Sequence, residues 1–423
     1  MKIRLRSLPL WPGLRPLLAP LLALLLTQPA QAAPAFNLEQ LQQAALAHNR
    51  HLQAGRENIS EAAAAIRSAG ALPNPEVEYL AGNARMRQPG ATPGSLRSVN
   101  ITQPLDLPDK RAARIGVASA GYQASVAGQQ ALEAELIAQL RQNYFDLLLR
   151  EAEVRAARED QKLIEAIRSR IALRVSSGEA PRYELIKAEA EALNTQKHVD
   201  VAGLRVEQSR AQLRQLVGPE LAADFQVNGQ LDQVPALPDL VQLRDELSSR
   251  NPELRRAQAE VEQAGAQYRL EKAQVWPQWA IRAGVDDEPD LRSSRIGVVL
   301  TLPLWDRREG PQAEAAARLA RRQHELAGRA FALGQALEYA HRQYEITQAQ
   351  IRALQSGILR QAESALQVAE AAYRFGERGI LEVLDAQRVY RAARNELISA
   401  RYELAAAWIE IERLRAATHK DNP

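Results

Sequence analysis

Two halves of this 423-residue sequence resemble each other, and this internal repeat restricts the possible folds more than any other feature. Three pairs of segments match: Asn49-Arg50-His51-Leu52 with Asn251-Pro252-Glu253-Leu254, Thr102-Gln103-Pro104-Leu105 with Thr301-Leu302-Pro303-Leu304, and Gly178-Glu179 with Gly376-Glu377. The spacing between matching segments shortens slightly along the chain, which is typical of a duplication followed by short loop deletions. Both halves are therefore expected to contain the same elements in the same order.

Each half is predicted to contain a helix, two short strands, a very long helix, a Gly-containing turn and a returning helix. In the first half these lie at about 37–72, 75–83 with 97–105, 110–175, 176–181 and 182–217. In the second half they lie at about 239–275, 277–286 with 294–304, 311–375, 376–380 and 381–416. The expected organisation is a first repeat at 33–217, an irregular linker at 218–238, a second repeat at 239–418 and a tail at 419–423.

Residues 1–32 have the pattern of a secretory signal peptide, with basic residues, an apolar run from Leu17 to Leu26 and an Ala30-Gln31-Ala32 cleavage site. The apolar run is too short for a membrane anchor, which needs roughly 20 residues. Removing the signal takes away four basic residues, so the net charge of +3 becomes nearly neutral and binding to nucleic acid is not expected. The chain has no cysteine, which excludes disulfides, thiolate metal sites and a lipid anchor on cysteine.

The predicted strands alternate between apolar and polar residues, as strands do when the two faces of a sheet meet different surroundings. One face of the second-half pair gathers apolar residues: Trp279, Ile281, Ala283, Val285, Ile296, Val298, Leu300 and Leu302. Each strand has about the length that crosses a bilayer when tilted, whereas no window of 18 residues after the signal is free of charge. A hairpin packed on a soluble core is the alternative, but it requires a covering surface.

The helices carry apolar seams that are already suited to pairing with one another. The returning helix of the second half has large residues every seventh position and small ones three later: Val383, Tyr390, Leu397, Leu404 and Ile411, then Ala386, Ala393, Ala400, Ala407 and Leu414. The long helix has its own seam: Leu333, Leu337, Ala340, Tyr344, Ile351, Leu354 and Ile358. A helix of this length would be on the order of 100 Å long, far more than a globular domain needs.

Four strands are too few to close a barrel, since small closed barrels need about eight. Two chains would give eight strands and a filled interior, whereas three would give twelve and an open lumen. The predicted fold is mostly α with a small β part: long antiparallel coiled-coil helices in a trimeric α-barrel, and four strands per chain in a shared 12-stranded transmembrane β-barrel. A simple antiparallel coiled coil explains the seams equally well but leaves the signal and the strands without a role.

Three segments carry a resemblance to a known family: Ala71-Leu72-Pro73-Asn74-Pro75, Thr102-Gln103-Pro104-Leu105-Asp106 running into Asp109-Lys110-Arg111, and the stretch from Tyr373 to Gln387. Over essentially its whole mature length the chain resembles the TolC-like outer-membrane efflux proteins. The first two segments are most similar to the branch that serves cobalt–zinc–cadmium efflux. The resemblance implies a homotrimer in the outer membrane of a Gram-negative bacterium, extending into the periplasm to a periplasmic adaptor protein and an inner-membrane proton-driven RND pump.

The resemblance also assigns roles to the two helical turns. Adaptor docking would involve Gly178 and Glu179 at the first turn and Gly376 and Glu377 at the second. The turns differ in one respect, because Pro181 follows the first where the second has Gly379, so the two need not dock identically.

A periplasmic gate is implied at the second turn, where Tyr373 and Arg378 would hold the helices shut and Glu382 and Asp385 would point inward. The residues themselves agree in part, since Glu382 and Asp385 are three apart and share a helical face. In a trimer they would form acidic rings that attract cations. The alternative is a pair of solvated carboxylates at a helix start, where the helix dipole favours negative charge.

Other chemistry finds little support in the sequence. His48 and His51 have the i, i+3 spacing of metal ligands, but with no third ligand nearby in sequence they are better interpreted as surface residues. The sequence contains no phosphate-binding loop, no HExxH and no GxSxG motif. Neither an enzyme nor a cofactor is expected.

The leading functional hypothesis is therefore the outer-membrane channel of a tripartite proton-driven efflux system that exports heavy-metal cations. The same channel could instead serve drug efflux or ATP-driven type I protein secretion. The alternative from another class is a soluble periplasmic coiled-coil adaptor, which would be expected to carry a lipoyl-like β-domain that the sequence lacks.

Overall fold

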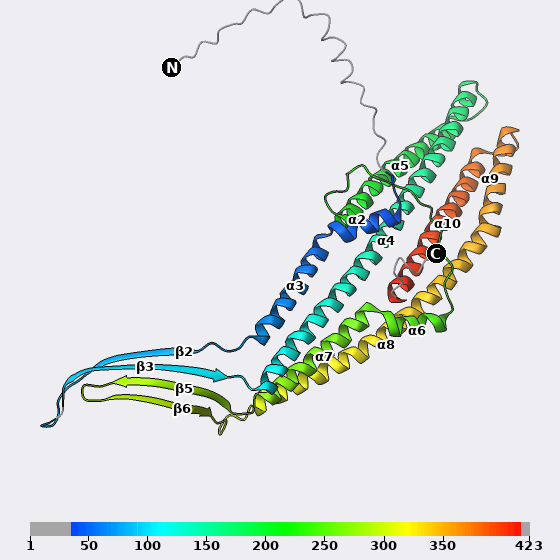
Figure 1. Ribbon diagram of the computed structural model, residues 1–423. Helices are drawn as coiled ribbons and strands as arrows, with labels where there is room; N and C mark the ends of the chain where they lie inside the picture. Colours follow the sequence, from blue (N-terminus) through cyan, green and yellow to red (C-terminus); the bar gives the residue numbers. More distant parts are fainter. Residues whose placement is uncertain (1–34, 91, 416–423) are drawn as a thin grey trace, which may run out of the picture.

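The computed structural model describes residues 35–90 and 92–415. The predicted signal peptide at 1–32 and the tail at 419–423 lie outside the described residues. The molecule is elongated: a four-stranded sheet projects at one end, and two helical hairpins extend side by side at the other (Figure 1). The described chain is predominantly helical with a small antiparallel sheet, as the sequence predicts.

Both halves contain the same elements in the same order, except that the long helix of the second half is divided by a π-helical turn. The first half consists of α2 Leu38–His48, α3 Arg50–Gly70, β2 Glu76–Ala84, β3 Gly94–Leu105, α4 Pro108–Ser176 and α5 Arg182–Val217. The second consists of α6 Leu240–Arg250, α7 Pro252–Ala273, β5 Gln278–Asp287, β6 Arg292–Thr301, α8 Glu309–Ala353, η1 Leu354–Ile358, α9 Leu359–Arg374 and α10 Ile380–Arg415. Between them, β4 Gln226–Val227 pairs in parallel with β1 Ala35–Phe36.

The first helix of each half is divided in two, which corrects the prediction of single helices at 37–72 and 239–275. The breaks fall at Asn49 and Asn251, whose backbone is extended with ψ of 123°. Each asparagine caps the helix that follows: the side-chain oxygen of Asn49 accepts from the amide of Leu52, at 3.1 Å, and that of Asn251 from the amide of Leu254, at 3.0 Å.

The same two side chains fasten the ends of the returning helices. The amide nitrogen of Asn49 donates to the carbonyl of Leu216 at 2.8 Å, and that of Asn251 donates to the carbonyl of Leu414 at 2.8 Å. The last carbonyls of a helix have no partner within the helix, so an external donor satisfies them. Each asparagine therefore joins the start of one helix to the end of another far along the chain.

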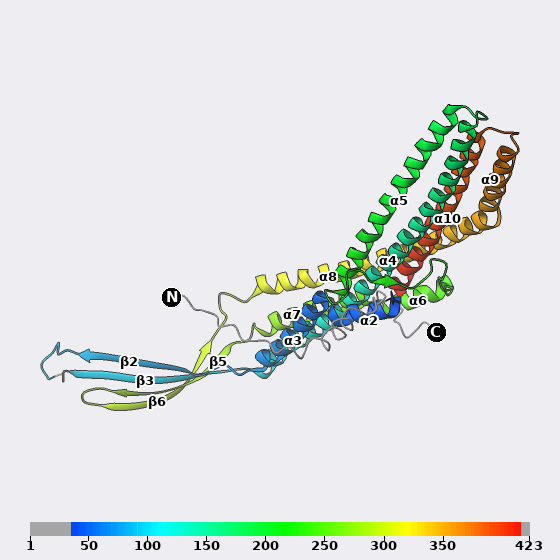
Figure 2. The ribbon, with the colours of Figure 1, turned by 90° about the horizontal axis from the view of Figure 1, so that it is seen from above.

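The long helix predicted at 311–375 is interrupted by the π-helical turn η1, and this changes the apolar seam. Leu354 is buried as predicted, but Ile358 is 52% exposed. Beyond the turn the seam resumes at Ala362 and Leu366, one residue later than the heptad requires. A π-turn inserts one extra residue into a helix, which accounts for the shift. Figure 2 shows α9 running at an angle to α8.

The sheet has the strand order β2-β3-β5-β6, with every neighbouring pair antiparallel. The register places apolar residues in rows across one face, such as Val77, Ile101, Ala283 and Ile296. The next row faces the other way, and its side chains are polar apart from the glycine: Glu78, Asn100, Gly284 and Arg295. The apolar side chains are exposed, and Figures 1 and 2 show no helix over either face. The alternative of a hairpin on a soluble core therefore has no covering core among the described residues.

Strand β6 is shorter than the predicted 294–304 and ends at Thr301. Pro303 lacks an amide hydrogen and cannot continue the ladder of hydrogen bonds. The amide of Leu304 instead donates to the carbonyl of Leu302 at 3.0 Å, which makes a tight turn. The residues after Thr301 consequently leave the sheet.

The helices form a layer with α4 near its middle, where α4 packs against α3, α5, α7 and α10. Helix α10 in turn packs against α8 and α9. The largest hydrophobic cluster surrounds the middle of α4, where Leu140, Leu147 and Phe225 are completely buried. Within residues 35–90 and 92–415, no helix is long and apolar enough to cross a membrane.

Candidate functional site at the hairpin tips

The two hairpins end in turns of the same geometry. In the first, the amide of Gly178 donates to the carbonyl of Val175 at 3.2 Å and that of Glu179 to Arg174 at 2.8 Å. Gly178 has φ of 80°, a left-handed conformation that costs glycine little. This arrangement is the Schellman motif, which ends many helices.

The second tip repeats these bonds. The amide of Gly376 donates to the carbonyl of Tyr373 at 3.1 Å, that of Glu377 donates to Ala372 at 2.9 Å, and Gly376 has φ of 79°. The residues to which the family resemblance assigns adaptor docking, Gly178 with Glu179 and Gly376 with Glu377, are all exposed and occupy equivalent positions.

A hydrophobic cluster holds the two hairpins together just behind the tips. It contains residues from α4, α5, α9 and α10: Ile164, Ile167, Ile171, Ala188, Leu366, Tyr373, Ile380, Val383 and Leu384. Tyr373 lies within it and is 4% exposed. Its ring centroid lies 5.1 Å from the guanidinium carbon of Arg174 on α4, a cation–π distance. Tyr373 thus contacts both hairpins, and sequence reasoning missed its partner Arg174.

The predicted charged gate residues lie on the surface beside this cluster. Arg378 pairs with Glu382 at 3.1 Å, and their side chains are 64% and 49% exposed. Asp385 is also exposed, one turn further along α10. The structure places Glu382 and Asp385 on one side of the first turns of α10, while Arg378 pairs locally within its own hairpin. The equivalent positions on α5 hold Glu184 and Lys187, so the paired acidic residues occur only at the second hairpin.

Further from the tips, an ionic clamp joins α10 to α4 and α5; we define the inter-hairpin clamp as Asp160, Glu191, Arg391 and Arg394. Arg394 donates to the Asp160 carboxylate at 2.6 Å and to the carbonyl of Ala156 at 3.0 Å. Arg391 donates to Glu191 at 3.3 Å. The side chains of Asp160 and Arg394 are only 7% and 13% exposed.

Burial raises the pKa of the Asp160 carboxyl, while Arg394 acts in the opposite direction. A carboxyl whose pKa is raised in the packed state binds its proton more tightly there than in water. Protonation of Asp160 at low pH therefore does not favour separation of the two hairpins. Sequence reasoning missed the clamp because its partners lie about 200 positions apart and show no local pattern.

The two histidines singled out by their spacing are both exposed. The nearest carboxylate contact of His48 is Glu220, with Nδ1 and Oε1 4.0 Å apart. Among the described residues, no group of three or more histidine, aspartate or glutamate side chains is arranged to hold a metal ion.

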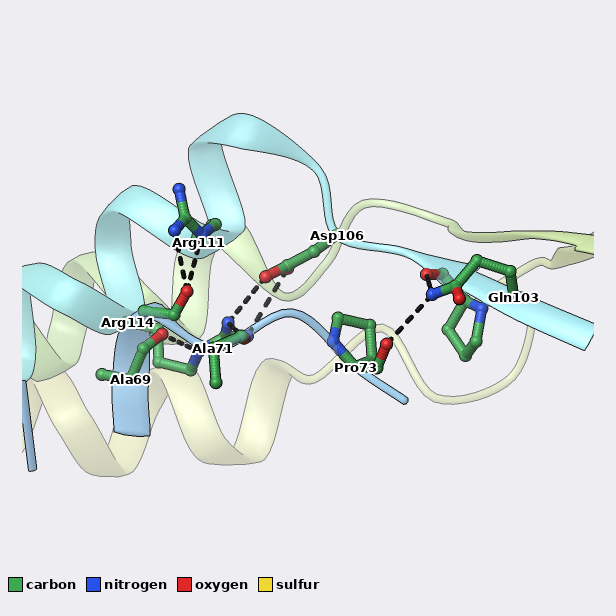
Figure 3. Close-up of polar contacts among 9 residues, drawn as sticks. Ala69, Ala71, Pro73, Gln103, Asp106, Arg111 and Arg114 are labelled. Atoms are coloured by element: carbon green, nitrogen blue, oxygen red, sulfur yellow. Dashed lines mark hydrogen bonds and ion pairs between the residues drawn. The ribbon is translucent and has the colours of Figure 1, made fainter. Parts of the chain in front are cut away.

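Two of the three segments that carried the family resemblance, at 71–75 and 102–111, meet at the junction between sheet and helices (Figure 3). The third, Tyr373 to Gln387, lies at the tip of the second hairpin. Arg114 donates to the carbonyls of Ala69 at 2.6 Å and Ala71 at 3.0 Å, and pairs with Asp106 at 2.6 Å. Arg111 donates twice to the carbonyl of Gly70, at 3.1 and 2.7 Å. These arginines satisfy the carbonyls at the end of α3 and fix the direction in which the strands leave the helices.

Long helical hairpins carrying an uncovered sheet with one exposed apolar face form the architecture of an outer-membrane channel protein. Residues 41–219 and 243–417 match the family described as outer membrane efflux protein. The chain belongs to this family. It is an outer-membrane efflux channel protein of Gram-negative bacteria, which confirms the predicted family, location and non-enzymatic character.

Individual proteins and structures agree with this assignment. The chain is 26% identical over 388 residues to the cobalt-zinc-cadmium resistance protein CzcC of Cupriavidus metallidurans, covering 91% of each chain. It is 26% identical over 306 residues to the nickel-cobalt-cadmium resistance protein NccC of Alcaligenes xylosoxydans, covering 70% of this chain and 67% of that one.

Two solved structures share the fold. A membrane protein from Pseudomonas aeruginosa superposes with a TM-score of 0.79 at 20% identity, covering 92% of each chain. The outer membrane protein VceC of Vibrio cholerae superposes with a TM-score of 0.75 at 19% identity, covering 89% of this chain and 95% of that one.

Proposed function

We propose that three copies of this chain form the outer-membrane duct of a proton-driven efflux system for heavy-metal cations, with a periplasmic adaptor protein and an inner-membrane RND pump as partners. The observation that carries the assembly is a pair of open edges. The sheet ends in β2 on one side and β6 on the other, with no further strand paired to either among the described residues. An open edge invites pairing with another chain, and three chains of four strands give a closed barrel of twelve.

The helix layer has open edges at the same two sides, and both carry exposed apolar residues. On α5 these are Tyr183, Ile186, Leu193 and Leu204, and on α8 and α9 they are Phe331, Tyr339, Ile346 and Val368. Each is more than half exposed in the single chain. Packing the α5 edge of one chain against the α8–α9 edge of the next would bury both sets and would close a ring, which a rotational assembly permits.

The heavy-metal substrate is supported by the two relatives named for cobalt, zinc, cadmium and nickel resistance. Deleting the gene is expected to increase sensitivity to zinc, cobalt and cadmium, and the gene carried on a plasmid should restore growth. Sensitivity to dyes and antibiotics alone would instead support drug efflux, and loss of a secreted protein would support type I secretion.

The purified assembly should have the mass of three chains.

The exposed pair Glu382 and Asp385 supports a cation-attracting entrance. In planar bilayers, Glu382→Gln combined with Asp385→Asn should reduce the preference for cations over anions by roughly threefold or more, because a trimer would lose six carboxylates at its narrow end. Glu363→Gln, which removes an exposed carboxylate from α9, is the matched control and should leave selectivity unchanged. Equal effects of the two changes would argue against a constriction at Glu382 and Asp385.

A further inference from the structure

The segment directly after β6 exposes an unusual amount of apolar surface. We define Leu302 to Arg307 as the collar segment. Leu302 is 50% exposed, Leu304 60% and Trp305 95%, and Trp305 is the most exposed of the large hydrophobic side chains in the described residues. Arg307 is also exposed, and its side chain makes no hydrogen bond or ion pair with any described residue. Within residues 35–90 and 92–415, no other part of the chain covers these apolar side chains.

Other tryptophans lie at the same end of the sheet. Trp279 pairs with Leu300 across β5 and β6 and with Leu105 on β3, at the end of the strands next to the helices. Trp276, which is 65% exposed, lies two residues before the start of this strand. The carbonyl of Trp276 accepts a hydrogen bond from Lys110 at 2.6 Å, so the junction of sheet and helices is both aromatic and basic.

Trp408 provides the contrast within the chain. It lies on α10 in the largest hydrophobic cluster, is 5% exposed, and its ring faces the guanidinium of Arg141 at 5.5 Å. Among the tryptophans of the described residues, the exposed ones are therefore gathered where the strands end.

The apolar face of the sheet leads directly into the collar segment. Ile296 is 82% exposed and Val298 63%, and Leu300 and Leu302 continue the same alternation towards Trp305. In an outer-membrane protein this face meets the acyl chains, because hydrocarbon is the surrounding that its exposed side chains match. The collar segment thus lies where acyl chains give way to headgroups. Tryptophan is enriched at that depth because its ring is apolar and its N–H is polar.

We propose that the collar segment is a lipid-binding surface: Leu304 and Trp305 insert at the boundary between acyl chains and headgroups in the leaflet nearest the helices, and Arg307 pairs with the phosphate of an anionic phospholipid. A basic side chain beside an interfacial aromatic residue suits an anionic headgroup. This surface would fix the height of the sheet in the bilayer. The inference uses the outer-membrane location of the chain and does not depend on the exported substrate.

The depth of Trp305 can be measured in proteoliposomes with the full-length protein, using a variant in which every other tryptophan is replaced by Phe. Phosphatidylcholine brominated near the headgroup should reduce the fluorescence of Trp305 by about half, and aqueous acrylamide should reduce it little. A variant that keeps only Trp408 is the matched control and should be quenched by neither reagent. Quenching of Trp305 by acrylamide alone would place it in water, and quenching by neither would place it against another copy of the chain. Either result overturns the proposal.

The headgroup contact has its own measurement. Binding of spin-labelled phosphatidylglycerol should exceed that of spin-labelled phosphatidylcholine for the unchanged protein, and Arg307→Gln should reduce the excess by roughly half or more. Arg87→Gln is the control, because Arg87 is an exposed arginine in the loop at the opposite end of β2. Equal lipid preference before and after Arg307→Gln, or an equal loss with Arg87→Gln, would rule out the assigned contact.

Discussion

Arg394→Ala is expected to lower the free energy of unfolding by about 3–5 kcal/mol, because it leaves the carboxylate of Asp160 buried without its ion-pair partner. The side chain of Asp160 is 7% exposed, so water cannot replace the lost guanidinium. The change also removes the bond from Arg394 to the carbonyl of Ala156. Denaturant unfolding of the purified protein in detergent measures the loss.

The control for this change is Arg360→Ala, which removes an exposed arginine from α9 and should alter stability by no more than about 0.5 kcal/mol. The double variant Asp160→Leu with Arg394→Met should recover most of the loss, since apolar side chains of similar size often replace a buried ion pair without cost. Similar losses for Arg394→Ala and Arg360→Ala would show that the clamp contributes little to stability.

The clamp also bears on the proposed gate. It fastens α10 to α4 and α5, and the tip cluster around Tyr373 holds the same two hairpins together. Without Arg394 the α9–α10 hairpin still has the bond from Arg391 to Glu191, the apolar contacts of the tip cluster and the cation–π contact between Arg174 and Tyr373. The single-channel conductance of the Arg394→Ala protein in planar bilayers should therefore rise if the hairpins separate when the duct opens.

The parts of the fold that depend on local pattern could be predicted from the sequence. The helix expected at 110–175 is α4 Pro108–Ser176, and the one expected at 182–217 is α5 Arg182–Val217. These bounds can be predicted because Pro108 is typical of a helix start, Gly178 is typical of a helix end, and the heptad pattern continues between them. The π-turn at Leu354–Ile358 was not predicted. Apolar residues occur both at the positions of an unbroken heptad and at the shifted positions, so one extra residue does not change the pattern visibly.

The candidate site at the hairpin tips could likewise be predicted only in part. The tip turns follow from glycines at equivalent positions. The roles of Tyr373 and Asp385 came from the family resemblance, and the spacing in the chain added only that Glu382 and Asp385 share a helical face. The partners that the structure adds, Arg174 beside Tyr373 and Asp160 beside Arg394, lie on a different hairpin from the residue that each contacts. Contacts of this kind depend on how the helices pack, which a single sequence does not specify.

Asn251→Ala should lower the free energy of unfolding by about 2–4 kcal/mol, the sum of a lost helix cap and a buried carbonyl left without a donor. Asn251 is 1% exposed, and it serves both the amide of Leu254 and the carbonyl of Leu414. Asn251→Ser keeps a capping oxygen but cannot reach Leu414, so its loss should be smaller and should measure the carbonyl contact. Denaturant unfolding of the purified variants checks both values.

Asp239→Ala provides the matched control, because Asp239 caps α6 through the amide of Gln242 at 2.8 Å and has no second role in the fold comparable to that of Asn251. It should cost about 1 kcal/mol. Asn49 makes the same two connections in the first half, so Asn49→Ala should behave like Asn251→Ala, and the two losses should add because the sites share no partners. If Asn251→Ala lowers the free energy of unfolding no more than Asp239→Ala does, the bond from Asn251 to Leu414 adds no stability. Helix capping would then be the only stabilising role of the two asparagines.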